Sequence, residues 1–129
     1  MAHVSVGETV LVVDDNELSL RLTRALLTKA GYDVRTASDA PGALSVLEGC
    51  RPRLILMDIQ LPGVDGLQLT RTLKTDPNTQ GIKILAVTAY TAKGDAEKAF
   101  VAGCDGYVSK PIDARALPGL VQQHINGTQ

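Results

Sequence analysis

The chain is poor in the residues that mark several classes of protein. Its 129 residues include no tryptophan, one phenylalanine and two cysteines, Cys50 and Cys104. There is no CxxC pair and no histidine at metal-ligand spacing, so the cysteines do not indicate a metal site. A disulfide between them is possible, but the sequence does not suggest one. We expect a reducing cytosol and two small, buried, hydrophobic cysteines.

The chain also lacks an excess of one charge and a long apolar run. Thirteen basic and fourteen acidic side chains give a net charge of −1, with no cluster of Lys or Arg that would indicate nucleic-acid binding. No apolar stretch approaches the roughly 18 residues of a membrane span, and "MAHVSVGE" does not resemble a signal peptide. We expect a cytoplasmic protein with no nucleic-acid or membrane partner.

The remaining composition is that of an ordinary globular domain. Hydrophobic residues make up 44% of the chain and charged residues 21%. The length fits one domain, which we expect over residues 9–126, with short tails at 1–8 and 127–129. No linker, low-complexity segment or second domain is visible.

Five short apolar runs predict strands. Three of them are nearly continuous in Val, Ile, Leu and Ala, as in strands that are buried on both faces of a parallel sheet. The runs are "TVLVVD" (9–14), "YDVRTA" (32–37), "RLILMD" (53–58), "IKILAVT" (82–88) and "GYVSK" (106–110).

Helical segments lie between and after these runs. The predicted helices span 17–30, 39–48, 65–75, 94–102 and 113–125. Strands that alternate with helices indicate repeated βαβ units with right-handed crossovers. The sequence therefore predicts a doubly wound α/β domain.

The first two helices carry the clearest signals. In the first, Leu18, Leu22, Ala25 and Leu26, followed by Lys29 or Ala30, form a stripe at helical spacing that we expect to be buried, and Gly31 ends the helix.

In the second helix, Asp39 is the expected cap and Pro41 lies in the first turn, while Ala43, Leu44 and Leu47 are expected to be buried. In the fifth helix, Pro118 predicts a kink or a delayed start.

Polar residues follow the predicted strands. Asp14 and Asp15 end the first strand, Asp58 the third, Thr88 the fourth and Lys110 the fifth. Ligands of open α/β sheets bind beyond the carboxyl ends of the strands. These five residues, which lie far apart in the sequence, should therefore meet at one edge of the sheet.

Such a group of residues suits phosphoryl transfer with a divalent cation. Clustered carboxylates raise one another's pKa unless a cation compensates their charge. Oxygen ligands without histidine or thiolate favour Mg²⁺ over zinc. Asp58 is the candidate nucleophile, because a carboxylate can form an aspartyl phosphate. Lys110 and the metal could neutralise the transferred charge, with the Thr88 hydroxyl as a further donor.

The motifs together resemble those of a known family. The pair Asp14-Asp15, "LMDIQLPGVDG", "VTAY" and "GYVSKP" are similar to the response-regulator receiver domain, which is CheY-like. The segments "DNEL", "LILMDIQLP" and "VTAYTAKGD" are similar to the corresponding sequences of single-domain regulators of the DivK type. The resemblance covers about residues 9–125 and implies a flavodoxin-like (βα)5 domain with strand order 2-1-3-4-5.

The resemblance also implies roles for individual residues. Asp58 would accept a phosphoryl group from a phosphohistidine on a histidine kinase or a histidine phosphotransfer protein. Asp15, Asp58 and the backbone carbonyl of Gln60 would bind Mg²⁺ directly, and Asp14 mostly through water. Lys110 would contact the phosphoryl group.

A switch and an output surface are implied as well. Thr88 and Tyr107 would move together after phosphorylation. The signal would leave through the face formed by the fourth helix, fifth strand and fifth helix, which includes Tyr90, Lys93, Tyr107 and Ile112. We expect the domain to catalyse its own phosphorylation and a slow loss of the phosphoryl group, not the turnover of a separate substrate.

Each of these residues also has a simpler explanation. Asp58, Asp14 and Asp15 could be turn or cap residues, Lys110 a solvated surface charge, and Thr88 an ordinary strand residue. Tyr107 could be a strand tyrosine that only packs against the core.

Three other functions remain as alternatives. A phosphatase of the haloacid dehalogenase type needs a second aspartate where this chain has Gln60. A flavodoxin-like cofactor binder needs glycines and donors where this chain has "DDNEL". A receiver cut from a hybrid histidine kinase fits the same motifs, although Met1 and the near-complete domain favour a stand-alone regulator.

Overall fold

Strands and helices alternate along the chain. The computed structural model describes residues 8–59, 66–88, 93–109 and 113–126, with the side chains of 93–96 left out. The strands are β1 (Thr9–Val13), β2 (Asp33–Ala37), β3 (Leu54–Asp58), β4 (Lys83–Thr88) and β5 (Gly106–Ser109). The helices are α1 (Glu17–Lys29), α2 (Ala40–Gly49), α3 (Gly66–Thr75), α4 (Lys93–Ala102) and α5 (Leu117–Ile125).

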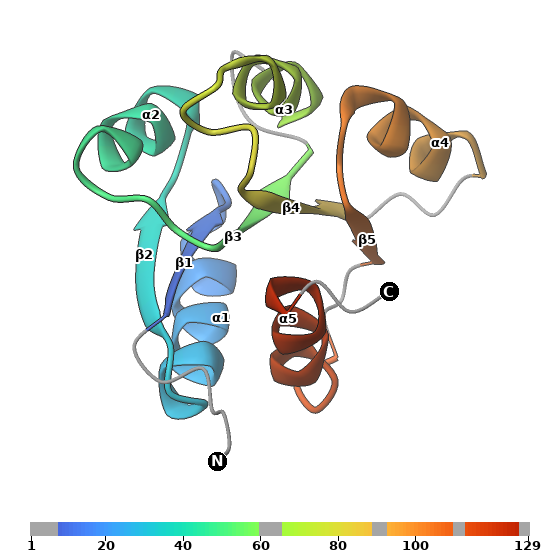
Figure 1. The fold of residues 1–129 in the computed structure, drawn as a ribbon. Helices are drawn as coiled ribbons and strands as arrows, with labels where there is room; N and C mark the ends of the chain where they lie inside the picture. The colour runs from blue at the N-terminus through green and yellow to red at the C-terminus, as the bar shows by residue number, and fades with distance from the viewer. Residues whose placement is uncertain (1–7, 60–65, 89–92, 110–112, 127–129) are drawn as a thin grey trace.

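The strands form one parallel sheet in the order β2-β1-β3-β4-β5. Helices α2, α3 and α4 cover one face of this sheet, and α1 and α5 cover the other (Figure 1). The predicted doubly wound fold and its strand order are therefore confirmed.

The sheet separates two apolar cores, because successive strand residues point to opposite faces. In β3, Ile55 and Met57 pack towards α2, α3 and α4, whereas Leu54 and Leu56 pack towards α1 and α5. All four side chains are fully or almost fully buried. Two buried faces explain why the central strands read as continuous apolar runs.

Side-chain caps fix the starts of the first two helices. The Asn16 side chain accepts a hydrogen bond from the Ser19 amide at 2.9 Å, and the Asp39 side chain accepts one from the Gly42 amide at 2.8 Å. Pro41 lies in the first turn of α2, where its missing amide costs nothing. Gly31 follows α1 with a φ of 105°, so the predicted cap, proline and stop are confirmed.

The stripe of α1 that was predicted to be buried is mostly exposed. Leu18 and Leu22 are 76% and 59% exposed and Ala25 is exposed too, whereas Leu26 is half-buried against the core. The helix buries Thr23 and Leu27 instead. Helix α1 carries two overlapping apolar stripes. The stripe that packs against the core includes Thr23, so the spacing of apolar residues alone favoured the other, more exposed stripe.

Three smaller expectations also need correction. Leu44 is 42% exposed because it lies on the open side of α2, and Cys50 is only half-buried because it follows that helix, whereas Cys104 is buried. Helix α5 begins at Leu117 and not at residue 113, with Pro118 in its first turn. The start of this helix is therefore delayed, since proline is tolerated there but not further inside.

Candidate functional site

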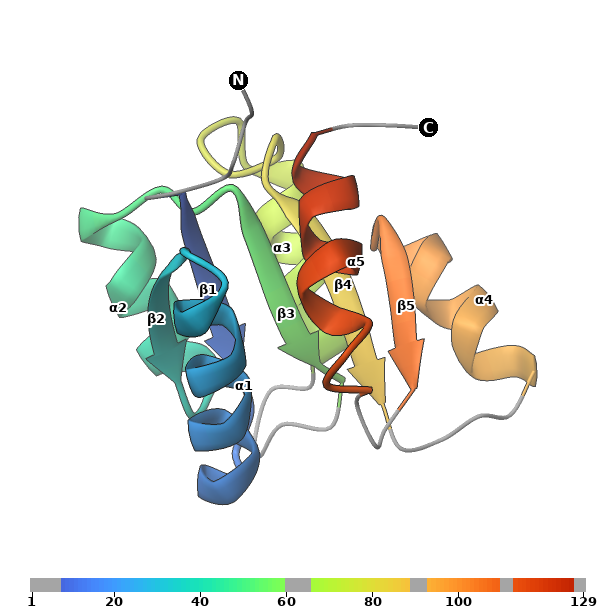
Figure 2. The ribbon, with the colours of Figure 1, turned by 90° about the horizontal axis from the view of Figure 1, so that it is seen from below.

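All five strands end at the same edge of the sheet (Figure 2). Val13 of β1 pairs with Met57 of β3, so Asp14 and Asp58 follow neighbouring positions on adjacent strands. Asp58 in turn pairs with Val87, which places Thr88 at the end of the next strand. The sheet register thus brings Asp14, Asp58 and Thr88, which are distant in sequence, to one edge of the sheet.

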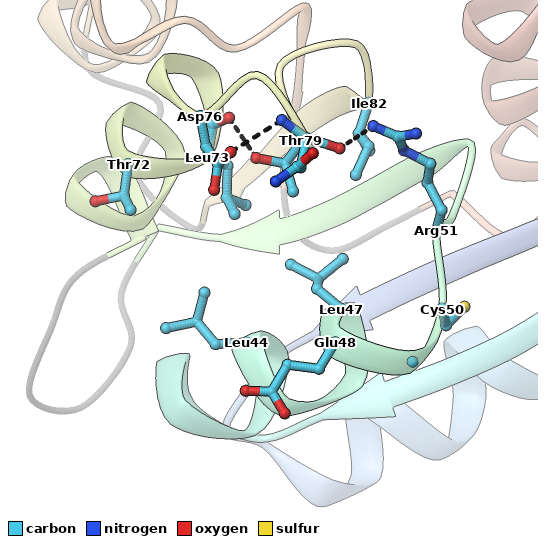
Figure 3. Close-up of a pocket in the computed structure, with 12 residues that line it drawn as sticks. Leu44, Leu47, Glu48, Cys50, Arg51, Thr72, Leu73, Asp76, Thr79 and Ile82 are labelled. Carbon is cyan, nitrogen blue, oxygen red and sulfur yellow. Dashed lines mark hydrogen bonds between the residues drawn. The ribbon is translucent and has the colours of Figure 1, made fainter.

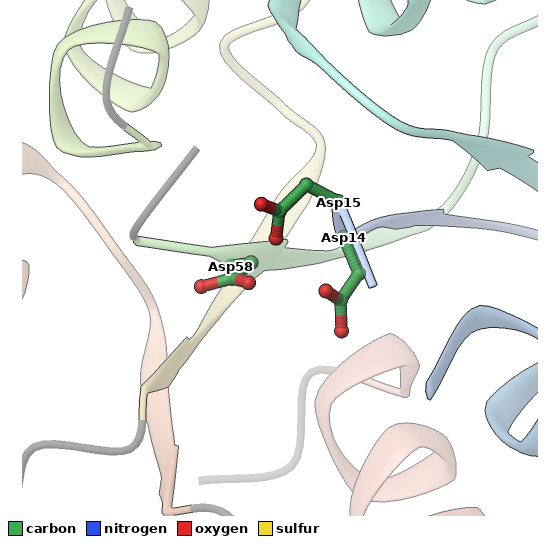
Figure 4. A group of neighbouring side chains, drawn as sticks. All are labelled: Asp14, Asp15 and Asp58. Carbon is green, nitrogen blue, oxygen red and sulfur yellow. The ribbon is translucent and has the colours of Figure 1, made fainter. Parts of the chain in front are cut away.

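Three carboxylates cluster at this edge. One oxygen each from Asp14, Asp15 and Asp58 lies within 4.8 Å of the others. Asp58 is 3% exposed and Asp14 5%, whereas Asp15 is exposed. The carboxylate of Asp15 points towards that of Asp58 (Figure 4).

The turn into α1 holds Asp14 in place. Its amide donates to the carbonyl of Ala37 at 3.1 Å, and one oxygen of its carboxylate accepts from the Asn16 amide at 2.9 Å. Asn16 is also the cap of α1. The same short turn therefore starts the helix and orients one acid of the cluster.

Backbone hydrogen bonds hold the end of β3. The Ile59 amide donates to the carbonyl of Val87 at 3.0 Å, and the Gly66 amide donates to the carbonyl of Ile59 at 2.8 Å. Gly66 was not among the residues that the sequence singled out, because a glycine at the start of a helix does not show which backbone it approaches.

The two predicted switch residues lie on the neighbouring strands. Thr88 is 1% exposed at the end of β4 and lies one position beyond the partner of Asp58. Tyr107 pairs with Ala86 in the sheet and is half-buried against the core beneath α2, α3 and α4. Gln60 and Lys110 lie outside the described residues, as do Tyr90 and Ile112 and the side chain of Lys93.

The donor set of the acid cluster fits a hard divalent cation. Three carboxylates repel one another at this distance unless a positive charge compensates them. Mg²⁺ is commonly held by one or two carboxylates together with water and phosphate oxygens. Of the aspartates, glutamates, histidines and cysteines in the described residues, only Asp14, Asp15 and Asp58 form a group of three whose ligand atoms lie this close together.

A hollow lies at the opposite end of the strands (Figure 3). It has a volume of about 690 Å³ and lies between α2 and the segment from α3 to β4. Leu44, Leu47 and Leu73 line it, together with Glu48 and Asp76. No group of metal-binding side chains among the described residues lines it, so the acid cluster is the stronger candidate for chemistry.

A family comparison agrees with this site. The family model described as response regulator receiver domain matches residues 10–122. The chain belongs to this family. Receiver domains of response regulators act in two-component signalling, where they interact with histidine kinases and downstream targets.

Similar proteins include single-domain regulators and parts of kinases. The polar-differentiation response regulator DivK of Brucella anthropi is 45% identical over 118 residues, which cover 92% of this chain and 96% of DivK.

Two solved structures are similar in fold. A putative response regulator from Chloroflexus aurantiacus has a TM-score of 0.88 and 30% identity, covering 93% of this receiver and 98% of that chain. The receiver domain of a sensor histidine kinase from Pseudomonas aeruginosa has a TM-score of 0.85 and 33% identity, covering 94% and 99%. That structure holds a magnesium ion in its active-site cleft.

The receiver carries no candidate membrane span in the part that the structure describes. None of its helices there is both long enough and apolar enough to cross a bilayer.

Proposed function

We propose that this receiver accepts a phosphoryl group on Asp58 and passes the signal on through protein contacts. The observation that carries the proposal is the Asp58 carboxylate itself, nearly buried at the end of β3 and within 4.8 Å of two further carboxylates. A buried carboxylate at a strand end that faces a cation site is suited to attack phosphorus.

The reaction would proceed in one displacement. A carboxylate oxygen of Asp58 attacks phosphorus, the bond from phosphorus to a histidine nitrogen of the donor breaks, and the leaving imidazole takes up a proton. The product is an aspartyl phosphate. Thr88 and Lys110 would donate hydrogen bonds to the phosphoryl oxygens, and Tyr107 would respond to the new position of Thr88.

Asp14, Asp15, Asp58 and the backbone carbonyl of Gln60 would hold the metal, which we propose to be Mg²⁺. When bound, it would neutralise charge that develops on the phosphoryl oxygens. The neighbouring structure with magnesium in its cleft supports this assignment, as does the all-oxygen donor set here.

The direct test uses a small acyl-phosphate donor. Incubation with Mg²⁺ should add one phosphoryl group to the intact protein, as measured by mass, because no partner is needed for this chemistry. Asp58→Asn and a chelated sample should show no adduct. An adduct that persists in Asp58→Asn would contradict the assignment of the acceptor.

We further propose that the natural donor is a phosphohistidine of a histidine kinase or phosphotransfer protein, which docks on α1. Leu18 and Leu22 are one turn apart, exposed, and begin three residues after Asp15. A donor that reaches Asp58 must cover the adjoining surface, and an exposed apolar pair there supports a protein partner.

The docking proposal is tested by comparing a protein donor of the phosphoryl group with a small acyl-phosphate donor. Leu18→Ser should slow transfer from a phosphohistidine protein about tenfold, while phosphorylation by acyl phosphate stays unchanged. Leu44→Ser, which changes an exposed leucine of α2, on the other face of the sheet from α1, is the matched control. Equal slowing of both donors by Leu18→Ser would mean that the variant damages the site itself.

The proposed output face comprises α4, β5 and α5. Phe100 and Val101 of α4 are 54% and 84% exposed, which supplies apolar surface for a downstream protein. Two free cysteines suit the reducing cytoplasm, where we place the protein.

A receiver within a hybrid histidine kinase is the second candidate. It is favoured by the similarity to the Pseudomonas kinase receiver. Isolating the native protein from cells and measuring its mass would distinguish the two: a mass close to 13.6 kDa indicates a stand-alone regulator.

A further inference from the structure

Gly66, the first residue of α3, touches the backbone of Asp58. A Cβ atom built on Gly66 would lie 2.2 Å from the carbonyl oxygen of Asp58 and 2.8 Å from the Cα of Ile59. Real Cβ contacts essentially never fall below 3.0 Å, and both neighbours are backbone atoms that cannot rotate away. Any side chain at position 66 would therefore force α3 and the end of β3 apart.

The need for glycine comes from space and not from the backbone angle. Among the described residues, the glycines with positive φ are Gly31 and Gly103. By contrast, Gly49 has no atom within 4 Å of an added Cβ. Close approach to another backbone is one of the uses of glycine that no other residue can replace.

Both sides of the contact are held. The Gly66 amide donates to the Ile59 carbonyl at 2.8 Å, and the hydroxyl of Thr70 donates to the Gly66 carbonyl at 2.8 Å. Thr70 is fully buried, and the Leu69 side chain beside it is 2% exposed. Helix α3 therefore cannot retreat without disturbing its own core contacts.

A displacement at this contact reaches the acid cluster directly. Asp58 supplies both the carbonyl oxygen that Gly66 touches and the carboxylate that faces Asp14 and Asp15. Mg²⁺ demands near-ideal octahedral geometry at 2.0–2.1 Å. A misplacement of about 1 Å can cost about 100-fold in rate.

We propose that Gly66 is a positioning residue, whose missing side chain lets α3 seat the Asp58 carboxylate for metal binding and phosphoryl transfer. The proposal rests on the proposed function of Asp58. It assigns Gly66 no contact with the phosphoryl group.

The test compares glycine-to-alanine variants that differ in position. Gly66→Ala should weaken Mg²⁺ binding about tenfold or more, measured by titration of backbone amide signals in the unphosphorylated protein. The Mg²⁺ concentration for half-maximal phosphorylation by acyl phosphate should rise equally. Gly49→Ala should change neither value.

A second control separates positioning from general damage. Gly103→Ala is strained by a φ of +111° and a contact of 2.9 Å with the Lys74 side chain, far from the acids. It should lower the midpoint of urea unfolding but leave Mg²⁺ affinity within about twofold. If both variants lose affinity in proportion to stability, or if Gly66→Ala binds like the wild type, the inference is overturned.

Two further outcomes are informative. If Gly66→Ala does not fold, Thr70→Val serves instead, because it removes a hydrogen bond that holds the Gly66 carbonyl within the first turn of α3 and adds no bulk at residue 66. About threefold weaker Mg²⁺ binding is expected, and unchanged binding overturns the inference. If the wild type itself neither binds Mg²⁺ nor gains a phosphoryl group, the proposed function fails first.

Discussion

The acid cluster sets an electrostatic conflict at the scale of single residues. Three carboxylates lie within 4.8 Å, and two of them are almost fully buried. Their repulsion is only partly screened by solvent, and two unit charges at this separation interact with about 1 kcal/mol even in water. The arrangement that favours a cation therefore destabilises the protein when the cation is absent.

Replacing one of the three acids with a neutral residue should stabilise the metal-free protein. Asp15→Asn is expected to raise the free energy of unfolding in chelator by about 1 kcal/mol, because it removes one of the repelling charges. It should also reduce the stabilisation by Mg²⁺, as measured by urea unfolding with and without the metal. Glu48→Gln removes an exposed charge far from the cluster and should change neither quantity. Loss of stability in Asp15→Asn without metal would show that the acids do not repel one another significantly.

The two cysteines should differ sharply in reactivity. Burial raises the pKa of the Cys104 thiol, which also approaches the Thr70 hydroxyl, whereas Cys50 is half-buried. The thiolate is the reactive form. One adduct with a thiol reagent is expected on the native protein and two after unfolding, measured by mass. In Cys50→Ser the native protein should remain unlabelled, and rapid labelling there would contradict the burial of Cys104.

The raised pKa of Cys104 also predicts an alkaline loss of stability. A buried neutral thiol contributes its full stabilisation below the pKa of the unfolded thiol, and this is lost as pH rises towards the higher pKa of the folded state. Urea unfolding at a series of alkaline pH values should show a steeper decline for the wild type than for Cys104→Ala. Parallel declines would mean that the thiol titrates alike in both states.

At the scale of helices and strands, the sequence pattern predicted where these elements occur better than it predicted which of their faces are buried. Caps and breakers such as Asp39, Gly31 and Pro118 act through local backbone chemistry, so they located helix ends within a few residues. The buried face of α1 depended on packing with the sheet and α5, which spacing does not contain. Exposure of Leu18 and Leu22 could therefore be learned only from the folded chain.

The cap of α2 offers a test that avoids the site. Asp39→Ala should lower the free energy of unfolding by about 1 kcal/mol, because the Gly42 amide loses its acceptor at 2.8 Å. The measurement is urea unfolding with Mg²⁺ absent. Ser45→Ala changes an exposed residue of the same helix and should leave stability nearly unchanged. A loss below about 0.3 kcal/mol in Asp39→Ala would indicate that water replaces the cap.

At the scale of the whole molecule, the position of the acid cluster was more predictable than the contact between α3 and the end of β3 that supports it. Asp14, Asp15, Asp58 and Thr88 follow apolar strands, and parallel strands must end at a common edge, so their meeting could be predicted. The close contact of Gly66 with Asp58 could not, because it depends on the angle at which α3 meets the sheet. Sequence patterns record which residues share a face but not how closely two elements approach.

One ion pair links three parts of the fold far from the acids. The Lys74 ammonium of α3 donates to the carbonyl of Ile82 at 2.8 Å and to the Asp105 carboxylate at 2.9 Å. The same oxygen of Asp105 accepts from the Ile84 amide at 2.8 Å. The pair thus joins α3 to the start of β4 and to the turn between α4 and β5.

Breaking this link should destabilise the whole domain. Lys74→Met is expected to lower the free energy of unfolding by about 2 kcal/mol, since hydrogen bonds to charged groups contribute about 1.5–3 kcal/mol. A double-mutant cycle with Asp105→Asn should give a coupling of about 1 kcal/mol. Additive effects of the two substitutions would contradict a direct interaction.

The pairing of β1 with β3 has a consequence for folding kinetics. Asp15 and Asp58 become neighbours only after the chain has closed a long loop around β2 and α2, which is slow compared with forming local turns. A nascent or partly folded chain therefore has no place for the cation. Competence to receive a signal should appear in a single late step, together with the completed central sheet.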